Sequence, residues 1–342
     1  MSGTQAAEAL EFPWPTLPAG EPPKEIMPGL HWGRQPLASR LDHVNHWILD
    51  DGGRTALIDT GADRRESRAW WTEILQRFAP LSRVIVTHHH YDHIGVAGWL
   101  CDSNDAPLWM TRTEWMSALA RMRSWTEAQQ LFRLRHFTGN GLSEAQASDI
   151  QALFGAFNDR LSPIPGAFHR LIPDDLIQIS GRAWTILLGE GHSPEQALFF
   201  CAEDKVLIAA DQVLPSITPH IGVWQDEPDG NPLQLFMNTL DRLAGLPHDL
   251  LVLPSHGLPF IGLHARLERL RQHHRRRLDE TEEACREWRT AAEVMGVLFR
   301  PPRDITDVAL AFTETLAHLQ YLLGTGRLEV ESTATLRRFR AR

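Results

Sequence analysis

Apolar positions along the chain follow two periods, and the places where the period changes outline its organisation. Before residue 88, short apolar runs bounded by turn residues predict strands at "GLHWGR", "NHWILDD", "RTALIDTG" and "SRVIVT", with a hairpin at "DGG". Residues 66–79 carry apolar side chains at helical spacing. Later runs predict strands at "LIQI", "AWTILLG", "QALFFC", "KVLIAAD" and "DLLVLPSHG". The chain therefore has two strand-rich halves.

Helical patterns separate and follow these halves. Residues 111–160 are helical, "NPLQLFMNTLDRLAGLP" predicts a helix between the last two strands, and helices are predicted at 263–286, 288–299 and 304–323 before a strand at "GRLEVES". This order favours an α+β fold in which a sandwich of sheets is covered by helices. We predict an N-terminal arm at 1–24, a large domain at 25–261 with a helical insert at 108–165, and a small helical domain at 262–342.

Composition narrows the class of protein. The 342 residues are 43% hydrophobic, enough for a full core, and no apolar run approaches the roughly 18 residues that a membrane span needs. The N-terminal stretch lacks the features of a secretory signal, and three cysteines give no disulfide framework, so we expect a cytoplasmic protein. The net charge of −9 argues against bulk binding of nucleic acid, although residues 263–342 carry 15 arginines against 12 acidic residues.

The candidate chemistry begins at "VIVTHHHYDHIG". Four histidines and one aspartate fall within six positions directly after a predicted buried strand, in the pattern His-x-His-x-Asp-His. In an extended segment His88 and His90 project to the same side, and Asp92 and His93 follow where the chain turns into a helix. Imidazoles and carboxylates are the ligands that a borderline-soft divalent ion such as zinc prefers. The motif predicts a metal site.

Three further candidates each follow an apolar strand. His192 comes after "WTILLGEG", Asp211 after "VLIAA" and His256 after "LLVLPS". A side chain at the end of a strand is held by a rigid element beside a flexible loop. Together the candidates give five histidines and two aspartates, enough for two metal ions.

The series Asp59-Thr60-Gly61, "THHHYDHIG", "GEGHSPE", "AADQ" and "LPSHG" resembles the metallo-β-lactamase fold superfamily, in its hydrolase branch, over residues 25–260. The resemblance implies an αββα sandwich with a two-metal site along one edge. It implies that one ion takes His88, His90 and His192, that the other takes Asp92, His93 and His256, and that Asp211 bridges them. It gives Asp59 a supporting role. This chain departs from the usual family sequence at Gly95-Val96 and at Ser193-Pro194-Glu195.

The expected reaction is hydrolysis. Two divalent ions, with Zn²⁺ preferred and Mn²⁺ or Fe²⁺ as alternatives, would share a bridging hydroxide whose pKa lies near 7 rather than about 16. Asp92 and Asp211 are the predicted catalytic residues, since they hold the metals and can accept the nucleophile's proton. Tyr91 and His220 are candidate substrate contacts. An iron oxidoreductase and a non-catalytic metal-binding protein are weaker alternatives.

The sequence favours one class of substrate but leaves alternatives. "THHHYDH" resembles the hydroxyacylglutathione hydrolases, which favours a small-molecule thioester of the acyl-glutathione or acyl-CoA type, although their glutathione-binding tyrosines and lysines have no counterpart here. An insert with Trp109, Trp115 and Trp125 would suit an apolar acyl chain if it covers the metals. Residues 262–330 resemble the winged-helix-like domain behind some hydrolases of this fold, some of which are endoribonucleases. A lactone or ester hydrolase and an endoribonuclease are therefore alternatives, and family relatives often form homodimers.

Overall fold

Two β-sheets carry the predicted strands. The computed structural model describes residues 10–123 and 125–342. The first sheet runs in the order β1 (Lys24–Met27), β2 (Leu30–Pro36), β3 (His43–Asp50), β4 (Thr55–Ile58), β5 (Leu81–Ile85), β6 (Leu108–Met110) and β7 (His169–Arg170). The second runs in the order β13 (Phe260–Ile261), β12 (Leu251–Pro254), β11 (Val206–Ala210), β10 (Gln196–Cys201), β9 (Arg182–Gly189) and β8 (Leu176–Ile179).

Strand direction decides which loops meet. In the first sheet β4 is parallel to β5, β5 to β6 and β6 to β7, whereas β1 to β4 pair antiparallel. In the second sheet β11 and β12 are parallel, and β10 is antiparallel to both β9 and β11. The C-terminal ends of strands β9, β11 and β12 therefore lie on the same side of their sheet, as those of β4 and β5 do in theirs. The segments that follow these five strands contain every predicted metal ligand.

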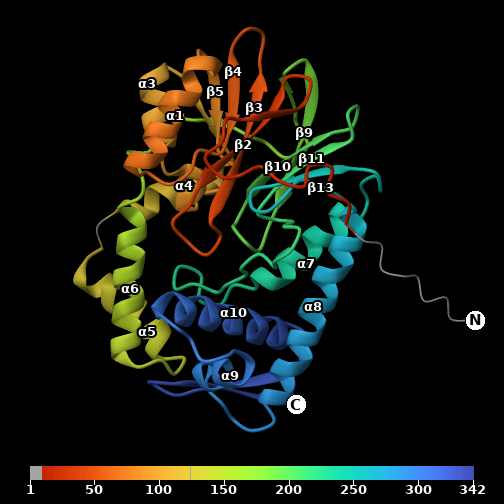
Figure 1. Cartoon of the computed structure of the whole chain (residues 1–342). Helices are drawn as coiled ribbons and strands as arrows, with labels where there is room; N and C mark the ends of the chain where they lie inside the picture. The colour runs from red at the N-terminus through yellow and green to blue at the C-terminus, as the bar shows by residue number, and fades with distance from the viewer. Residues whose placement is uncertain (1–9, 124) are drawn as a thin grey trace, which may run out of the picture. The chain divides into compact units, whose positions relative to one another are not determined.

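Apolar side chains fill two layers. One layer lies between the sheets and includes Trp32 and Trp47 from the first sheet and Trp184 and Phe199 from the second. The other lies between the outer face of the first sheet and the helices α1 (Arg65–Phe78) and α3 (Ala97–Asn104), which cover that face in Figure 1. Burying each large apolar side chain stabilises the fold by roughly 1.5–3 kcal/mol. These layers hold the sheet edges in fixed positions.

The remaining helices are α2 (Tyr91–Ile94), α4 (Arg112–Arg121), α5 (Glu127–Thr138), α6 (Glu144–Asn158), α7 (Pro232–Leu243), α8 (Leu263–Ala284), α9 (Ala291–Leu298) and α10 (Ile305–Gly324). The predicted α+β class, with sheets flanked by helices and a C-terminal helical region, is confirmed. Strands β1, β6, β7, β13 and β15 (Arg337–Ala341) were not predicted. Most are very short, or they lie where no alternating pattern marks them.

The chain forms two compact units. The first contains both sheets and consists of residues up to 122, 157–219 and 243–267; the second consists of 123–156, 220–242 and 268–342. In the second unit the turn at 139–141 bonds to α9 and β15 through Ala292 N to Asn140 O (3.1 Å) and Arg337 N to Gly139 O (2.7 Å). Helix α10 is largely buried, and β14 (Leu328–Ser332) pairs with β15. The predicted insert at 108–165 is therefore divided, since β6 and α4 belong to the first unit and α5 to the second.

The described part of the predicted N-terminal arm packs within the first unit. Glu11 bridges to Ile261, and Leu17 is buried in the layer between the sheets. Residues 1–9 of the predicted arm lie outside the described residues. Among the described helices, none combines the length and apolar character that crossing a membrane would require.

Candidate metal centre

The first ligand segment follows β5, and its backbone is fixed by Asp59. Asp59 lies just after β4 with φ of 63°, a left-handed conformation that aspartate tolerates better than most residues. Its carboxylate accepts hydrogen bonds from Thr87 N (2.8 Å), Thr87 Oγ1 (2.9 Å) and His93 Nδ1 (2.8 Å). The parallel pairing of β4 with β5 brings these residues together. Asp59 thus contacts the strand end and one predicted ligand.

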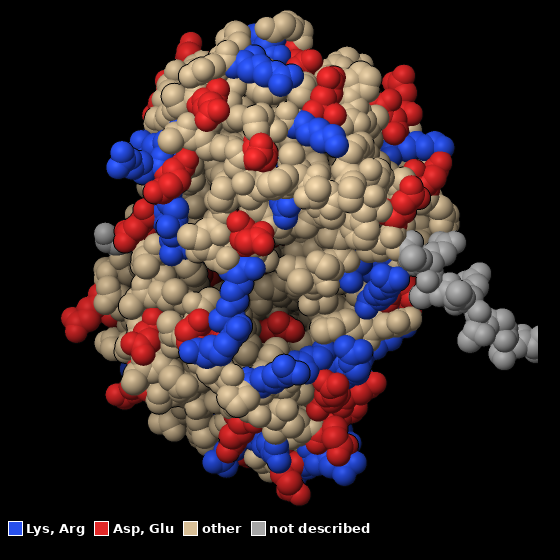
Figure 2. Space-filling view, viewed as in Figure 1, with Lys and Arg blue, Asp and Glu red and all other residues tan. Residues whose placement is uncertain are grey.

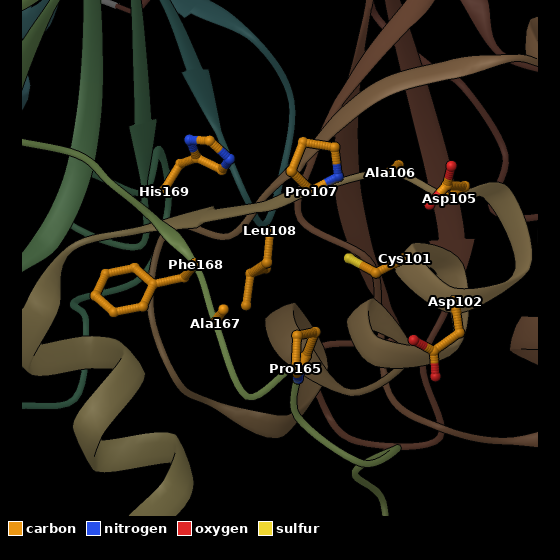
Figure 3. Close-up of a pocket in the computed structure, with 10 residues that line it drawn as sticks. All are labelled: Cys101, Asp102, Asp105, Ala106, Pro107, Leu108, Pro165, Ala167, Phe168 and His169. Carbon is orange, nitrogen blue, oxygen red and sulfur yellow. The ribbon is translucent and has the colours of Figure 1, made fainter.

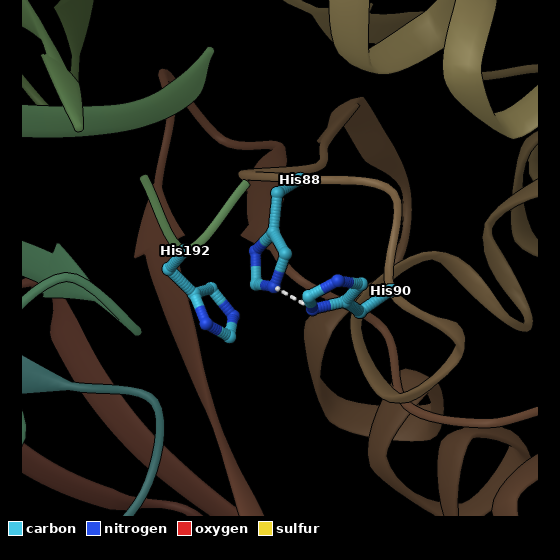
Figure 4. A group of neighbouring side chains, drawn as sticks. All are labelled: His88, His90 and His192. Carbon is cyan, nitrogen blue, oxygen red and sulfur yellow. Dashed lines mark hydrogen bonds between the residues drawn. The ribbon is translucent and has the colours of Figure 1, made fainter. Parts of the chain in front are cut away.

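Three histidines form the first ligand group. His88 Nε2 and His90 Nδ1 are 3.1 Å apart, and the ring centroids of His88 and His90 lie 5.2 and 4.7 Å from that of His192. Figure 4 shows the three rings facing one another, with His192 arriving from a different part of the chain. His90 and His192 are only partly buried. This group therefore combines one fully buried ring, that of His88, with two partly buried ones.

Asp92, His93 and His256 form the second group, and all three are buried. His256 Nε2 lies 3.6 Å from Asp92 Oδ2, and His93 Nε2 lies 3.9 Å from Asp92 Oδ1. Asp211 reaches both groups, because its carboxylate is 3.4 Å from His192 Nε2, 3.6 Å from His93 Nε2 and 3.4 Å from His256 Nε2. The structure thus brings the seven side chains together in two groups with Asp211 between them, and their roles as metal ligands stay a prediction.

The geometry fits bound metal. Two ligand atoms that each lie 2.0–2.1 Å from one tetrahedral zinc ion are about 3.3 Å apart, and the separations between ligand atoms here run from 3.1 to 3.9 Å. Within the described part of the chain, His93 Nε2, His256 Nε2 and Asp211 Oδ1 are buried with no hydrogen-bond partner. Buried polar atoms without partners are costly, and a cation at their centre would satisfy all three. These clusters are able to hold a dinuclear metal site.

Three of the imidazoles are oriented by hydrogen bonds on their Nδ1 side. His93 Nδ1 donates to Asp59, His256 Nδ1 to the carbonyl of His43 (2.7 Å), and His88 Nδ1 contacts Thr87 Oγ1 (2.9 Å). This fixes the tautomer that leaves the Nε2 lone pair directed at the site. The supporting hydrogen bonds therefore prepare the rings for a metal.

The pKa values of the ligand histidines shift in opposite directions in the two groups. Burial lowers the pKa of His88 and of His90 well below 6.5, so both rings are neutral at neutral pH. Burial alone would raise the pKa of Asp211, but the neighbouring His256 and His93 hold it well below 3.8. Burial alone would likewise lower the pKa of His93, yet the carboxylates of Asp59, Asp211 and Asp92 raise it well above 6.5. A metal at this group would displace a proton.

The loop that carries His256 is anchored across the two sheets. Asn45 of β3 donates from Nδ2 to Pro254 O (2.8 Å) and Gly257 O (2.9 Å), and its backbone N donates to Ser255 O (2.7 Å). His43 Nε2 accepts from Gly257 N (2.7 Å). We did not predict either supporting residue from the sequence, because a polar side chain within a strand carries no sign of the loop that it will meet.

Glu114 of α4 is a second residue that sequence reasoning missed. Its side chain is fully buried, and it bonds to His89 beside one ligand segment and to Ser193 and Glu195 beside another. Burial would raise the pKa of Glu114, but the charge and hydrogen bond of His89 lead the interactions that lower it. The "TRTE" at 111–114 has the form of a helix capping box, which conceals this role.

The two candidate substrate contacts lie in different units. Tyr91 begins α2, and its ring stacks on Phe157 (5.0 Å between centroids) while burial raises its pKa to about 12. His220 belongs to the second unit, where its Nδ1 is 3.9 Å from Glu314 and its Nε2 is 3.2 Å from Thr313 Oγ1. The role of each as a substrate contact stays a prediction.

A cavity of about 560 Å³ lies in the first unit away from these ligands. It is lined by the end of α3, by β6 and by the segment before β7, including Cys101, Leu108 and Phe168 (Figure 3). Its lining contains none of the seven predicted ligands. Burial raises the pKa of the Cys101 thiol to about 12, so it is protonated and unreactive at neutral pH. The cavity does not belong to the metal centre.

Comparison with known families identifies this architecture. The model of the metallo-beta-lactamase superfamily matches residues 39–256, which include all seven predicted ligands. The chain belongs to this superfamily. A second model, the metallo-beta-lactamase-like C-terminal domain, matches residues 278–342. The C-terminal helical region is thus shared with other family members, whereas its likeness to a winged helix stays a prediction.

Individual relatives agree with this assignment. A solved beta-lactamase domain protein from Burkholderia ambifaria is 35% identical, with a TM-score of 0.89, covering 97% of this chain and 98% of that one. A solved metallo-beta-lactamase family protein from Thermus thermophilus, TTHA1429, is 28% identical, with a TM-score of 0.80, covering 93% and 100%. Among curated proteins, "Probable metallo-hydrolase YqjP" of Bacillus subtilis is 23% identical over 80% of this chain and 86% of its own length. The chain is a metallo-hydrolase of this superfamily.

Proposed function

We propose that this chain is a dinuclear metal-dependent hydrolase that cleaves a thioester of the acyl-glutathione or acyl-CoA type. The observation that carries the two-metal part is the position of Asp211, whose two carboxylate oxygens lie within 3.6 Å of histidines from both ligand groups. The thioester part is supported by the likeness of "THHHYDH" to the hydroxyacylglutathione hydrolases. Zinc is the proposed metal, since imidazole and carboxylate ligands suit it.

Two divalent ions held by these residues supply Lewis acidity, which acidifies water and polarises a carbonyl oxygen. The protein supplies the rest. His88, His93 and His256 are oriented by hydrogen bonds at Nδ1, and Asp92 and Asp211, whose carboxylates lie 3.6 and 3.4 Å from His256 Nε2, would accept a proton leaving water. Asp92 and Asp211 are therefore the proposed catalytic residues, each also binding metal.

We propose that the substrate approaches the three-histidine group. His90 and His192 are partly buried residues and His93 and His256 are fully buried, but the side chains of His192 and Asp92 are similarly exposed, at 8% and 10%. A substrate carbonyl would approach from the His90 and His192 side, near the start of α2 where Tyr91 lies. We therefore keep Tyr91 as a proposed substrate contact, and His220 as a second one on the sequence argument alone.

Lactone or ester hydrolysis is an alternative that uses the same residues, because the attacked carbonyl is chemically similar. An endoribonuclease is a further alternative, since a two-metal centre also suits phosphodiester cleavage. On the face shown in Figure 2, however, Lys and Arg are interspersed with Asp and Glu rather than gathered in a single-sign field. A field of one sign is what attracts nucleic acid. We rank RNA below acyl compounds for this reason.

The experiment is free-thiol release from a panel of acyl-glutathione and acyl-CoA thioesters, with protein loaded with two equivalents of zinc. Asp211→Asn and metal-depleted protein are the controls. Turnover that disappears in both controls supports the proposal. Fully loaded protein that cleaves none of the thioesters but opens a lactone, or cuts single-stranded RNA, would replace the thioester by that substrate.

A further inference from the structure

The carboxylate of Glu114 links two segments that are far apart in the sequence. Its Oε2 accepts hydrogen bonds from His89 N (3.0 Å) and His89 Nδ1 (2.5 Å), and its Oε1 accepts from Ser193 Oγ (2.6 Å) and Glu195 N (2.7 Å). His89 lies between His88 and His90, and Ser193 directly follows His192. One carboxylate thus contacts residues adjacent to all three histidines of the first ligand group.

The surroundings of Glu114 suit an ionised carboxylate. Glu114 is 0% exposed, and its four contacts are all hydrogen-bond donors when His89 carries its proton on Nδ1. Two of the donors are backbone N–H groups, one at each oxygen. An amide in place of the carboxylate would turn its NH₂ toward one of these N–H groups in either orientation. Only an ionised carboxylate satisfies both segments at once.

The N-terminal end of α4 and the segment after His192 both donate and accept the hydrogen bonds that join them. Thr111 Oγ1 donates to Glu195 O (2.7 Å), and Thr113 N donates to Glu195 Oε2 (3.2 Å), so Glu195 occupies the N-terminus of α4. Thr111 and Glu114 stand in the spacing of a capping box, but Thr111 makes no side-chain cap hydrogen bond to its own helix. Both side chains instead contact the segment that follows His192. The departures at Ser193 and Glu195 from the usual family sequence are the residues that make these contacts.

We propose that Glu114 is a positioning residue for the three-histidine group, and that α4 of the insert builds this half of the metal centre. Glu114 sets the distance between the 88–90 segment and the 192–195 segment, and thereby the ligand spacing at one ion only. It has no hydrogen bond to Asp92, His93 or His256 among the described residues. This inference rests on the proposed two-metal function, but its test needs no substrate.

The test measures Co²⁺ binding, because the visible absorption of bound cobalt reports its coordination. Two backgrounds separate the groups: His256→Ala leaves the three-histidine group, and His192→Ala leaves the Asp92, His93 and His256 group. In the His256→Ala background, Glu114→Gln should weaken cobalt binding 10–100-fold and change the cobalt spectrum, as loss of a residue that orients ligands does. In the His192→Ala background it should change neither.

Equal weakening in both backgrounds would overturn the proposal, since it would indicate a general loss of stability. Unchanged binding in both would overturn it as well. If Glu114→Gln does not fold, Ser193→Ala removes a single donor and should weaken the same group by a smaller factor. Asp51→Asn is the matched control, because Asp51 is a partly buried carboxylate paired with Arg83 in the β3–β4 hairpin, at the opposite end of β4 from the ligands. A wild-type protein that binds two cobalt ions but cleaves no thioester would contradict the substrate alone and leave the role of Glu114 intact.

Discussion

Replacing Asp59 with asparagine alters the proton on a predicted ligand without removing any ligand. Asp59 accepts from Thr87 N and Thr87 Oγ1 and from His93 Nδ1 at 2.8–2.9 Å. If the amide oxygen of asparagine takes the Thr87 N–H, its NH₂ faces His93 Nδ1. That contact is favourable only if Nδ1 loses its proton. The proton then moves to Nε2, the atom that faces Asp92 and Asp211 at 3.9 and 3.6 Å.

Asp59→Asn is expected to lower both the stability of the fold and the affinity for one metal ion. Loss of a hydrogen bond to a charged group in a fully buried site lowers the free energy of unfolding by about 1.5–3 kcal/mol. A wrong tautomer at one ligand weakens metal binding by about 10–100-fold, which is about 1.4–2.7 kcal/mol at one ion. The backbone should not change, since asparagine also tolerates the left-handed conformation at φ 63°.

The assay is competition for zinc with a chromophoric chelator, with urea unfolding of the metal-free protein in parallel. Asp59→Asn should release one zinc ion to the chelator more readily and hold the other with unchanged affinity. Asp63→Asn is the control, since Asp63 pairs with Arg68 rather than with a ligand. Wild-type affinity for both ions in Asp59→Asn would refute the reasoning on the tautomer.

Three other predictions concern the ligands, the pH and one close approach. Asp211→Asn should lower the affinity for both ions, because Asp211 is within 3.6 Å of histidines in both groups, and metal content by mass spectrometry measures this. Acid should destabilise the protein: burial lowers the pKa of His46 to about 3 and of His136 to about 4, so the unfolded chain binds these protons first. As the pH falls below about 6.5, each group should remove about 1.4 kcal/mol of stability per pH unit until its folded pKa is reached, and unfolding in urea at pH 7, 6 and 5 tests the slope. Gly95→Ala should lower stability by about 1–3 kcal/mol in calorimetry, since the added Cβ would lie 2.5 Å from Asp63 N and Tyr91 O; an unchanged melting temperature would contradict this.

The sequence was informative where chemistry and strand ends coincide. Crowding within six positions made His88, His90, Asp92 and His93 recognisable. A position just after an apolar strand did the same for His192, Asp211 and His256. The structure brings these seven residues together. Supporting residues give no such signal. Asn45 lies within a strand, and Glu114 imitates a helix cap, because the loops that they contact are distant in sequence.

Nothing in the sequence indicated that residues 108–165 are divided between the two units. Its helices were predicted, but helical spacing shows only that a face is apolar and does not show which surface covers it. Trp115 thus stacks on Phe168 within the first unit (4.6 Å between centroids), whereas α5 packs in the second unit through Phe137 against Phe312 (6.0 Å). The segment therefore cannot be treated as a single lid, and the acyl-chain argument built on it is weaker.

Each ligand group combines residues that follow strands of both sheets. A metal ion bound at either group would therefore crosslink the two sheets. His88 and His90 follow a strand of the first sheet, whereas His192 follows one of the second; His93 and His256 are divided in the same way. An ion bound at either group closes a loop of more than 100 residues, which for a permanent bond would cost the unfolded chain roughly 4–5 kcal/mol of entropy. Metal supply would then govern how long the two sheets stay docked, as well as whether the centre can react. Starvation for metal should shorten the lifetime of the protein before any substrate is involved.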